Sequence, residues 1–276
     1  MIERIYIPTI RRADNQITFN NLPKELQRKV IMVVESGERH LYNYDCEYLE
    51  LPEKIVGEFY QLAETRKFIY EHAGTIKYAV MDDDLTIRRR NSKYWTGKSN
   101  MEKSKRDAIP DEILLAFDTC EKWLDEPDIG IVGLTDQSIG VPPPPVEYQD
   151  TVFVAGIIFV DGAKIQEELH DMDITSVRIA EDLIFIYECL SRGINTRKSV
   201  EWMFTNGSAK KGMTETSQSG TGHNSSDLHY DALKYIQTKF PKGIKLYEKD
   251  GIRKNRKYCK KIYTPKLNTT LTNFMR

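Results

Sequence analysis

Residues 78–85 read YAVMDDDL, an apolar run that stops at the three consecutive carboxylates Asp82, Asp83 and Asp84. A short hydrophobic run of this kind predicts a buried β-strand over Ile76–Met81, and its abrupt end places the three acids at the rim of a sheet. Carboxylates at such a rim hold a divalent cation and, through the cation, phosphate oxygens. An acidic turn without a ligand is the alternative, because Asp is common in turns.

The composition describes a soluble globular protein. The 276 residues are 40% hydrophobic and 29% charged, which suits one large or two small domains. The longest apolar run, Val152–Val160, is too short to span a bilayer, and residues 1–8 read as a strand rather than a signal peptide. The four cysteines have no CxxC spacing, so we expect reduced thiols, no zinc and a cytoplasmic location.

Strand-like and helical patterns alternate along the chain. Strands are predicted at Arg4–Pro8, Val30–Glu35, Glu47–Leu51, Ile76–Met81, Ile129–Leu134 and Thr151–Val160. Helices are predicted at Gly57–Ala73, Pro110–Glu126, Glu181–Arg192 and Ser226–Lys239, and loops at Asn91–Ile109, Asp136–Gln149 and Asn206–Asn224. This order predicts an α/β fold with a mostly parallel sheet covered by helices on both faces. We expect one domain over residues 1–240, with a basic C-terminal extension over 241–276 packed on it.

One arginine interrupts an apolar helix face. Arg66 falls on the apolar stripe of the predicted helix Gly57–Ala73, and an arginine directed toward a core needs a carboxylate or phosphate partner. The expected partner is the acidic cluster or the phosphates that it collects. The alternative is that Arg66 reaches back to the surface.

The ends of the first two strands carry groups suited to a nucleotide. Ligands of open α/β sheets bind beyond the carboxyl ends of the strands. The hydroxyl of Thr9 and the charge of Arg11 or Arg12 are expected to meet a nucleotide there, and Glu35 is a candidate acceptor for a base or ribose. No GxGxxG follows the first strand and no GxxxxGK[ST] occurs in the chain, which argues against a dinucleotide dehydrogenase and a P-loop NTPase.

Two further motifs contain titratable groups. Glu181 and Asp182 begin a predicted helix, where one of them is a candidate base toward an acceptor hydroxyl. Acids in a first helical turn also interact favourably with the helix dipole, which is the structural alternative. His223 lies in a loop of small residues and suits a metal ligand supplied by a closing loop.

Charge is concentrated in two segments, although the net charge is only −1. Residues 88–106 contain eight Lys and Arg residues against Glu102, and residues 242–266 contain ten against Glu248 and Asp250. The second segment interleaves bases with tyrosines, a pattern typical of surfaces that neutralise phosphates and stack on bases. A basic strand pair on the surface with another role is the alternative.

In this order the motifs resemble the GT-A class of nucleotide-sugar glycosyltransferases, over about residues 2 to 230. The short chain and the basic tail are more similar to the phage DNA-base glycosyltransferases, which are encoded beside enzymes that hydroxylate or hydroxymethylate pyrimidines. The resemblance implies transfer of a sugar from a nucleoside-diphosphate donor, expected to be UDP-linked, to a hydroxymethylated pyrimidine in phage DNA. An acceptor hydroxyl there is reached only if the base leaves the duplex.

The resemblance also implies residue roles. The nucleotide-sugar site would contain Pro8, Thr9, Arg11, Glu35, Arg66, Asp82 and Asp83. The metal ligands would be Asp84, Asp82 and His223, with Mn²⁺ preferred over Mg²⁺ because manganese tolerates an imidazole better. Asp182 matches the base of inverting members, with Glu181 as its substitute. The charge pattern of the tail, rather than the resemblance, predicts a DNA surface of Arg253, Lys254, Arg256, Lys257, Lys260 and Lys261.

Other classes of protein use parts of this pattern. A metal-dependent nucleotidyltransferase or nuclease also needs clustered Asp residues. A glycosyltransferase of the same class could act on a glycan, a protein or a small molecule. A DNA-binding protein without activity would keep the basic tail but would have no use for Arg66 directed at the acidic cluster. The sequence leaves the sugar, the stereochemical outcome and the oligomeric state open.

Overall fold

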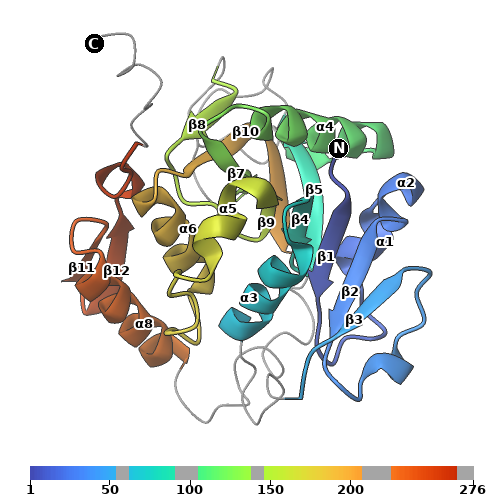
Figure 1. Ribbon diagram of the computed structural model, residues 1–276, viewed down its shortest axis with the longest axis horizontal. Coiled ribbons are helices and arrows are strands. Elements are labelled where there is room, and N and C mark those ends of the chain that lie inside the picture. Colours follow the sequence, from blue (N-terminus) through green and yellow to red (C-terminus); the bar gives the residue numbers. More distant parts are fainter. Residues whose placement is uncertain (54–61, 91–104, 138–145, 207–224, 266–276) are drawn as a thin grey trace.

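The computed structural model describes residues 1–53, 62–90, 105–137, 146–206 and 225–265. A ten-stranded sheet lies at its centre, and β8 (Tyr148–Asp150) pairs with β10 beside the main path (Figure 1). From one edge to the other the path runs β3 (Glu47–Glu50), β2 (Val30–Val34), β1 (Arg4–Pro8), β4 (Lys77–Met81), β9 (Ile157–Asp161), β7 (Ile129–Asp136), β10 (Asn195–Asn206), β5 (Leu85–Arg90) and β6 (Lys105–Asp107).

Strand direction brings several carboxyl ends to one edge. β1 pairs in parallel with both β2 and β4, and β2 pairs in parallel with β3. β9 lies antiparallel between β4 and β7, and β10 runs parallel to β7. The predicted α/β class with a mostly parallel sheet is confirmed. The residues that follow β1, β2 and β4 therefore meet at the same edge.

Helices cover both faces of the sheet (Figure 1). One hydrophobic cluster includes residues of α3 (Leu62–Ala73), α5 (Gly162–Leu169), α6 (Glu181–Ser191) and α8 (Ser225–Lys239). The other includes residues of α1 (Ile17–Asn21), α2 (Lys24–Gln27) and α4 (Pro110–Leu124). Strand β1 feeds both clusters because its side chains alternate: Tyr6 belongs to the first, and Ile5 and Ile7 belong to the second.

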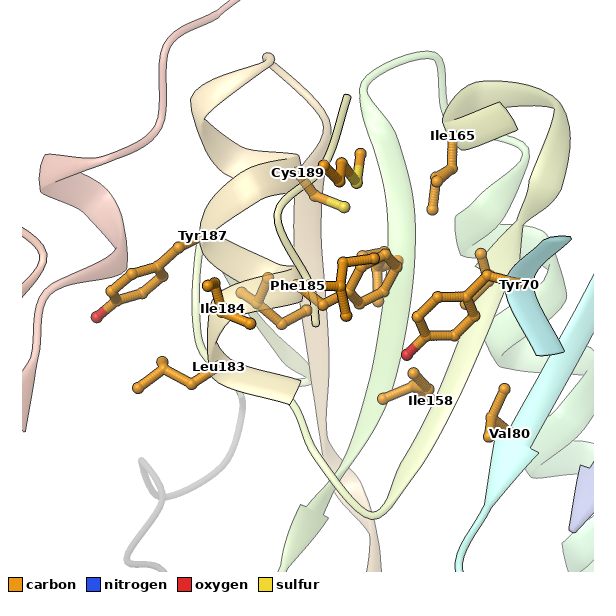
Figure 2. Close-up of a cluster of buried hydrophobic side chains, with 14 of the residues drawn as sticks. Tyr70, Val80, Ile158, Ile165, Leu183, Ile184, Phe185, Tyr187 and Cys189 are labelled. Carbon is orange, nitrogen blue, oxygen red and sulfur yellow. The ribbon is translucent and has the colours of Figure 1, made fainter. Parts of the chain in front are cut away.

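The first cluster fixes α3 against α6 (Figure 2). The rings of Tyr70 on α3 and Phe185 on α6 stack with their centroids 4.3 Å apart and their planes 22° apart. Such a pair contributes about 0.5–1.5 kcal/mol beyond its buried area. The two helices therefore keep a fixed relative position, and this position sets the geometry of the side chains one turn earlier on each helix.

The C-terminal residues form a hairpin beside α8. Strand β11 (Ile244–Lys249) pairs antiparallel with β12 (Ile252–Lys257). Asp250 and Gly251 turn the chain with φ of 54° and 69°, as a type I′ Asp-Gly turn requires. Ile244 and Cys259 are buried in the same cluster as α6. In the described part of the chain, no helix has the length and apolar character to cross a membrane.

The predicted elements match the structure unevenly. β1 has the predicted bounds, and α4, α6 and α8 differ from prediction by one or two residues at an end. The predicted strand Thr151–Val160 is wrong in its first half, because Thr151 and Gly156 have φ of 55° and 74° and the strand begins only at Ile157. The predicted loop Asn91–Ile109 contains β6 at its end, while residues 91–104 lie outside the described residues.

Candidate active site

The acidic turn after β4 is anchored by backbone hydrogen bonds. The Asp82 amide donates to the Gly156 carbonyl at 3.1 Å, and the Thr18 amide donates to the Asp83 carbonyl at 3.0 Å. The Thr18 hydroxyl accepts from the Leu85 amide at 2.8 Å. Gly156 permits this approach, since a Cβ there would lie 2.6 Å from the Phe204 ring. The turn is therefore held from both sides by segments distant in sequence.

Asp83 faces the end of β1. Its carboxylate accepts a hydrogen bond from the Thr9 hydroxyl at 2.7 Å and another from the Arg12 guanidinium at 2.6 Å. Arg12 also lies 3.5 Å from Asp84, and Gln16 donates to the Thr9 hydroxyl at 2.7 Å. Burial raises the pKa of the Asp83 carboxyl to about 6, although the Thr9 hydrogen bond and the Arg12 charge oppose the shift.

Asp82 faces α3 instead. Its carboxylate forms an ion pair with Arg66, whose side chain is only 7% exposed, whereas the Asp82 side chain is 41% exposed. The Arg66 Nε lies 3.8 Å from the Glu181 carboxylate at the start of α6. The Arg66 guanidinium therefore lies between the acidic turn and the first residue of α6. This is the carboxylate partner that an arginine on the apolar stripe needs.

Helix packing explains why Arg66 and Glu181 meet. Arg66 precedes Tyr70 by four residues on α3, and Glu181 precedes Phe185 by four residues on α6. Residues four apart lie on the same helix face, so the stacked rings align the two charged side chains one turn nearer the sheet edge. Ala180 precedes α6 in the left-handed region, with φ of 66°. That conformation is uncommon for a residue with a side chain and is a feature found at functional sites.

The two acids at the start of α6 have different surroundings. Glu181 is buried, whereas Asp182 is half-buried and accepts a hydrogen bond from the Leu183 amide at 2.7 Å. Burial raises the pKa of both carboxyl groups, and for Glu181 the charge of Asp182 adds to the shift. Lys257 and His229, from β12 and α8, lie within electrostatic range of Asp182. Asp182 is therefore the acid that faces the C-terminal elements.

The ends of β1 and β2 form the other side of this edge. The Thr9 amide donates to the Val33 carbonyl at 3.0 Å, and Glu35 directly follows β2. Arg11, with φ of 51°, is exposed, and its amide donates to Glu38 at 3.0 Å. Burial raises the pKa of the Glu35 carboxyl, with Glu38 adding to the shift and Arg11 opposing it. Pro8, Thr9, Arg11 and Glu35 thus lie together around a short segment of backbone.

The structure distinguishes two predicted residues and adds two others. Of Arg11 and Arg12, which the sequence left as alternatives, Arg12 contacts the acidic turn. Gln16 and Thr18, which the sequence patterns did not single out, support Thr9 and the turn backbone. A polar side chain shortly after a strand was the available signal, but nothing in the pattern distinguished Arg12 from Arg11. His223, the predicted third metal ligand, lies outside the described residues.

The described residues test the metal prediction only in part. Among residues 1–53, 62–90, 105–137, 146–206 and 225–265, no group of three or more His, Cys, Asp and Glu side chains is arranged to hold an ion. Asp82 and Asp84 interact electrostatically, and their carboxylate oxygens are the donors that Mg²⁺ and Mn²⁺ prefer. The donor set thus fits two ligands of a hard divalent ion, and further ligands must come from elsewhere.

The six predicted DNA-binding residues do not share one environment. Lys254, Arg256, Lys260 and Lys261 are exposed. Arg253 is ion-paired with Asp227 at 2.5 Å and lies over the Tyr230 ring. Lys257 is half-buried beside Asp182 and is thereby separated from the exposed set.

The first basic segment is neutralised by neighbouring acids where the structure describes it. Arg88 pairs with Asp107, and both Arg89 and Arg106 pair with Glu112. Burial and these pairs leave little free positive charge on β5 and β6. The exposed lysines and arginine of the C-terminal segment are therefore the stronger candidate for a phosphate-binding surface.

Residues 3–196 match the family model of the TET-associated glycosyltransferases. The match covers most of the chain, so the chain belongs to this family of glycosyltransferases. No curated protein matches it.

Three solved structures illustrate the more distant likenesses. The S. aureus TarS fragment 1–349 in complex with UDP is 14% identical, with a TM-score of 0.42, over 74% of this chain and 60% of that one. The chain thus spans about three fifths of that fragment. Glucosyl-3-phosphoglycerate synthase from Mycobacterium tuberculosis, in complex with Mn²⁺, UDP and phosphoglyceric acid, is 10% identical, with a TM-score of 0.42. The likeness covers 92% of this chain and 86% of that one. The UTP-bound UGPase from Acinetobacter baumannii is 10% identical, with a TM-score of 0.39, over 88% of this chain and 95% of that one.

Proposed function

We propose that this glycosyltransferase transfers a sugar from a nucleoside-diphosphate donor, expected to be UDP-linked, to the hydroxyl of a hydroxymethylated pyrimidine in DNA. The observation that carries the proposal is the arrangement at the sheet edge. The buried Arg66 links the partly exposed Asp82 to Glu181, and Asp182 follows Glu181 on the side of the basic hairpin. The residues proposed to bind the sugar donor thus lie next to Asp182, the residue proposed to deprotonate the acceptor hydroxyl.

The donor half would use the residues that follow the parallel strands. Thr9, Glu35 and Arg11 frame the nucleoside, and Pro8 ends the strand that presents them. Arg66 is held in place by two carboxylates, so its guanidinium is positioned before a diphosphate arrives. We propose that this preorganised charge stabilises the leaving nucleoside diphosphate.

A divalent ion belongs to the same half of the proposal. Asp84 and Asp82 would hold Mn²⁺ or Mg²⁺, with His223 as the further ligand expected from the resemblance. When bound, such an ion neutralises the negative charge that develops on the departing diphosphate. Asp83 takes no part in this role, because Thr9 and Arg12 already occupy its carboxylate.

Asp182 would act as the base toward the acceptor. Its carboxylate is more exposed than that of Glu181, and its raised pKa suits removal of a proton from a hydroxyl near neutral pH. Glu181 instead contacts Arg66 and would position it. The proton passes from the acceptor hydroxyl to Asp182 while the hydroxyl oxygen attacks the anomeric carbon. The bond between the anomeric carbon and the phosphate oxygen breaks, and the nucleoside diphosphate leaves.

The nucleic-acid acceptor is supported by charge and by the family. Lys254, Arg256, Lys260 and Lys261 are exposed in the segment that also delivers Lys257 to Asp182. The family name records an association with TET, which is consistent with the resemblance to enzymes encoded beside pyrimidine hydroxylases. We propose that the enzyme works in the cytoplasm, in the host if a phage encodes it.

A screen of donors and acceptors tests the proposal. The enzyme is incubated with Mn²⁺, one nucleotide sugar at a time, and duplex DNA that contains either hydroxymethylated or unmodified pyrimidines. We expect release of nucleoside diphosphate only with the hydroxymethylated duplex, together with a mass increase of the DNA by one glycosyl unit. Transfer to a glycan, protein or small molecule but not to this DNA would retain the glycosyltransferase and remove the DNA acceptor.

A further inference from the structure

Two lysines lie near each other where the C-terminal hairpin packs, and one of them, Lys257, is within electrostatic range of Asp182. Lys198 is on β10, and its side chain is almost fully buried, with 9% of the residue exposed. Lys257 ends β12, and its Nζ lies 3.5 Å above the centroid of the Phe153 ring. The two ammonium groups are within electrostatic range of each other, and both are within range of the buried Cys259. The hairpin therefore places its last residue close to Lys198 of the central sheet.

In the described part of the chain, neither ammonium group contacts a partner of opposite charge. Among the residues that the structure describes, neither Nζ forms a hydrogen bond or an ion pair, and the acids in range are Asp136 for Lys198 and Asp182 for Lys257. Arg197, next to Lys198 in sequence, forms ion pairs with both Asp150 and Glu126.

Unpaired burial has a cost that a ligand would remove. Burial lowers the pKa of both lysines, because each ammonium has lost part of its hydration. A buried charge without a counter-charge destabilises the fold. Arg197 shows that the same strand satisfies a buried cation where the role is structural. Two adjacent cations without such partners are typical of a site that receives an anion.

We propose that Lys198 and Lys257 form a phosphate-binding subsite beside Asp182, separate from the contacts of Arg66. The inference rests on the proposed function for its two sources of phosphate. One is the diphosphate of the donor as it leaves, and the other is the phosphodiester next to the acceptor base. In both cases the subsite would hold a phosphate within reach of the group that takes the acceptor proton.

Pyrophosphate without a divalent metal is the first probe. We expect it to raise the Tm of the wild-type protein, and the increase should disappear in Lys198→Met and Lys257→Met. Lys249→Met is the matched control, since Lys249 lies on the other strand of the same hairpin and is exposed, and it should keep the increase. Without ligand, Lys198→Met should melt at or above the wild-type temperature, because methionine removes an unpaired buried charge. A clear loss of stability or a failure to fold would show that Lys198 is structural and overturn the proposal.

Two binding measurements identify the source. If the subsite takes the donor diphosphate, Lys257→Met should weaken binding of UDP with Mn²⁺ about tenfold, or about 1.4 kcal/mol, and leave DNA binding unchanged. If it takes the phosphodiester, the same loss should appear with a fluorescein-labelled hydroxymethylated duplex and not with UDP. Unchanged affinity for pyrophosphate, UDP and DNA in both variants would overturn the subsite. A wild-type enzyme that binds pyrophosphate through these lysines but modifies no DNA would instead refute only the proposed acceptor.

Discussion

The sheet edge and the C-terminal hairpin both concentrate charge, but they do so in opposite ways. At the edge, Arg66, Asp82 and Asp83 are tied to partners far away in sequence, and most of these side chains are buried. On the hairpin segment, Lys254 and Arg256 are exposed, and they belong to a strand pair that closes through a two-residue turn.

This difference separates two tasks. Buried ion pairs cost desolvation free energy and are strongly destabilised when one partner is lost, so they fix a single geometry. Exposed cations contribute little to stability and act at a distance through solvent, where salt screens them. The edge is therefore suited to positioning one donor, and the hairpin segment to collecting a polyanion of any sequence. Lys257 belongs to the hairpin in sequence, but it is half-buried and within electrostatic range of Asp182.

The largest expected effect is at the edge. Asp84→Ala should reduce glycosyl transfer by roughly 1000-fold or more, because removing an ion that stabilises a leaving diphosphate is worth several kcal/mol. Thermal melting should show a folded protein. The conservative Asp84→Glu variant is the control, because it keeps the carboxylate charge but changes its position. Near-normal turnover in folded Asp84→Ala would refute the assignment of Asp84 as a metal ligand.

The next effect distinguishes the two acids of α6. Asp182→Asn keeps the shape but cannot accept a proton, so kcat should fall by about 100- to 10,000-fold while affinity for UDP is unchanged. Glu181→Gln should affect binding of the diphosphate more than proton transfer, since Glu181 contacts Arg66. Retained turnover in Asp182→Asn, combined with its loss in Glu181→Gln, would exchange the two roles.

A smaller effect is expected on the hairpin segment. Replacing Lys254, Arg256, Lys260 and Lys261 by Gln should weaken DNA binding and reduce the slope of log K against log salt by roughly 0.9 for each lost phosphate contact. Affinity for the nucleotide sugar should not change. The control for net charge is a variant that neutralises four exposed cations on other elements, Lys24, Arg28, Lys122 and Lys234. A salt slope equal to that of the wild type, measured by fluorescence anisotropy, would exclude this segment from the DNA surface.

The smallest effect concerns stability and pH. Burial raises the pKa of Glu181 in the folded protein above its ordinary value, so the folded state favours the protonated carboxyl. The stability that this group contributes is fully present below its ordinary pKa of about 4.5 and is lost as pH rises through the folded pKa. Glu181→Gln should therefore melt a few degrees above wild type at pH 8 and differ little at pH 4. If the Tm of both proteins falls equally between pH 4 and pH 8, the raised pKa of Glu181 is contradicted.

The sequence predicted the elements whose patterns are local. The run that ends at Asp82, the parallel strands and the amphipathic helices were recognisable from spacing alone. β5 and β10 were missed, because Arg88, Arg89, Arg197 and Lys198 make them read as polar, and the arginines are paired with acids distant in sequence. The position of Arg66 was predictable from its apolar stripe. The proximity of Lys257 to Asp182 was not, since it depends on how the hairpin packs against α6.

The central claim is that a glycosyl group, rather than a nucleotide, moves to the acceptor. A UDP-sugar that carries ¹⁴C in the sugar and ³²P in the α-phosphate separates the two outcomes in one reaction. With Mn²⁺ and hydroxymethylated duplex DNA, we predict that ¹⁴C enters the DNA while ³²P stays in released UDP, and that Asp182→Asn prevents both. Incorporation of ³²P into the product would identify a nucleotidyltransferase and contradict the account.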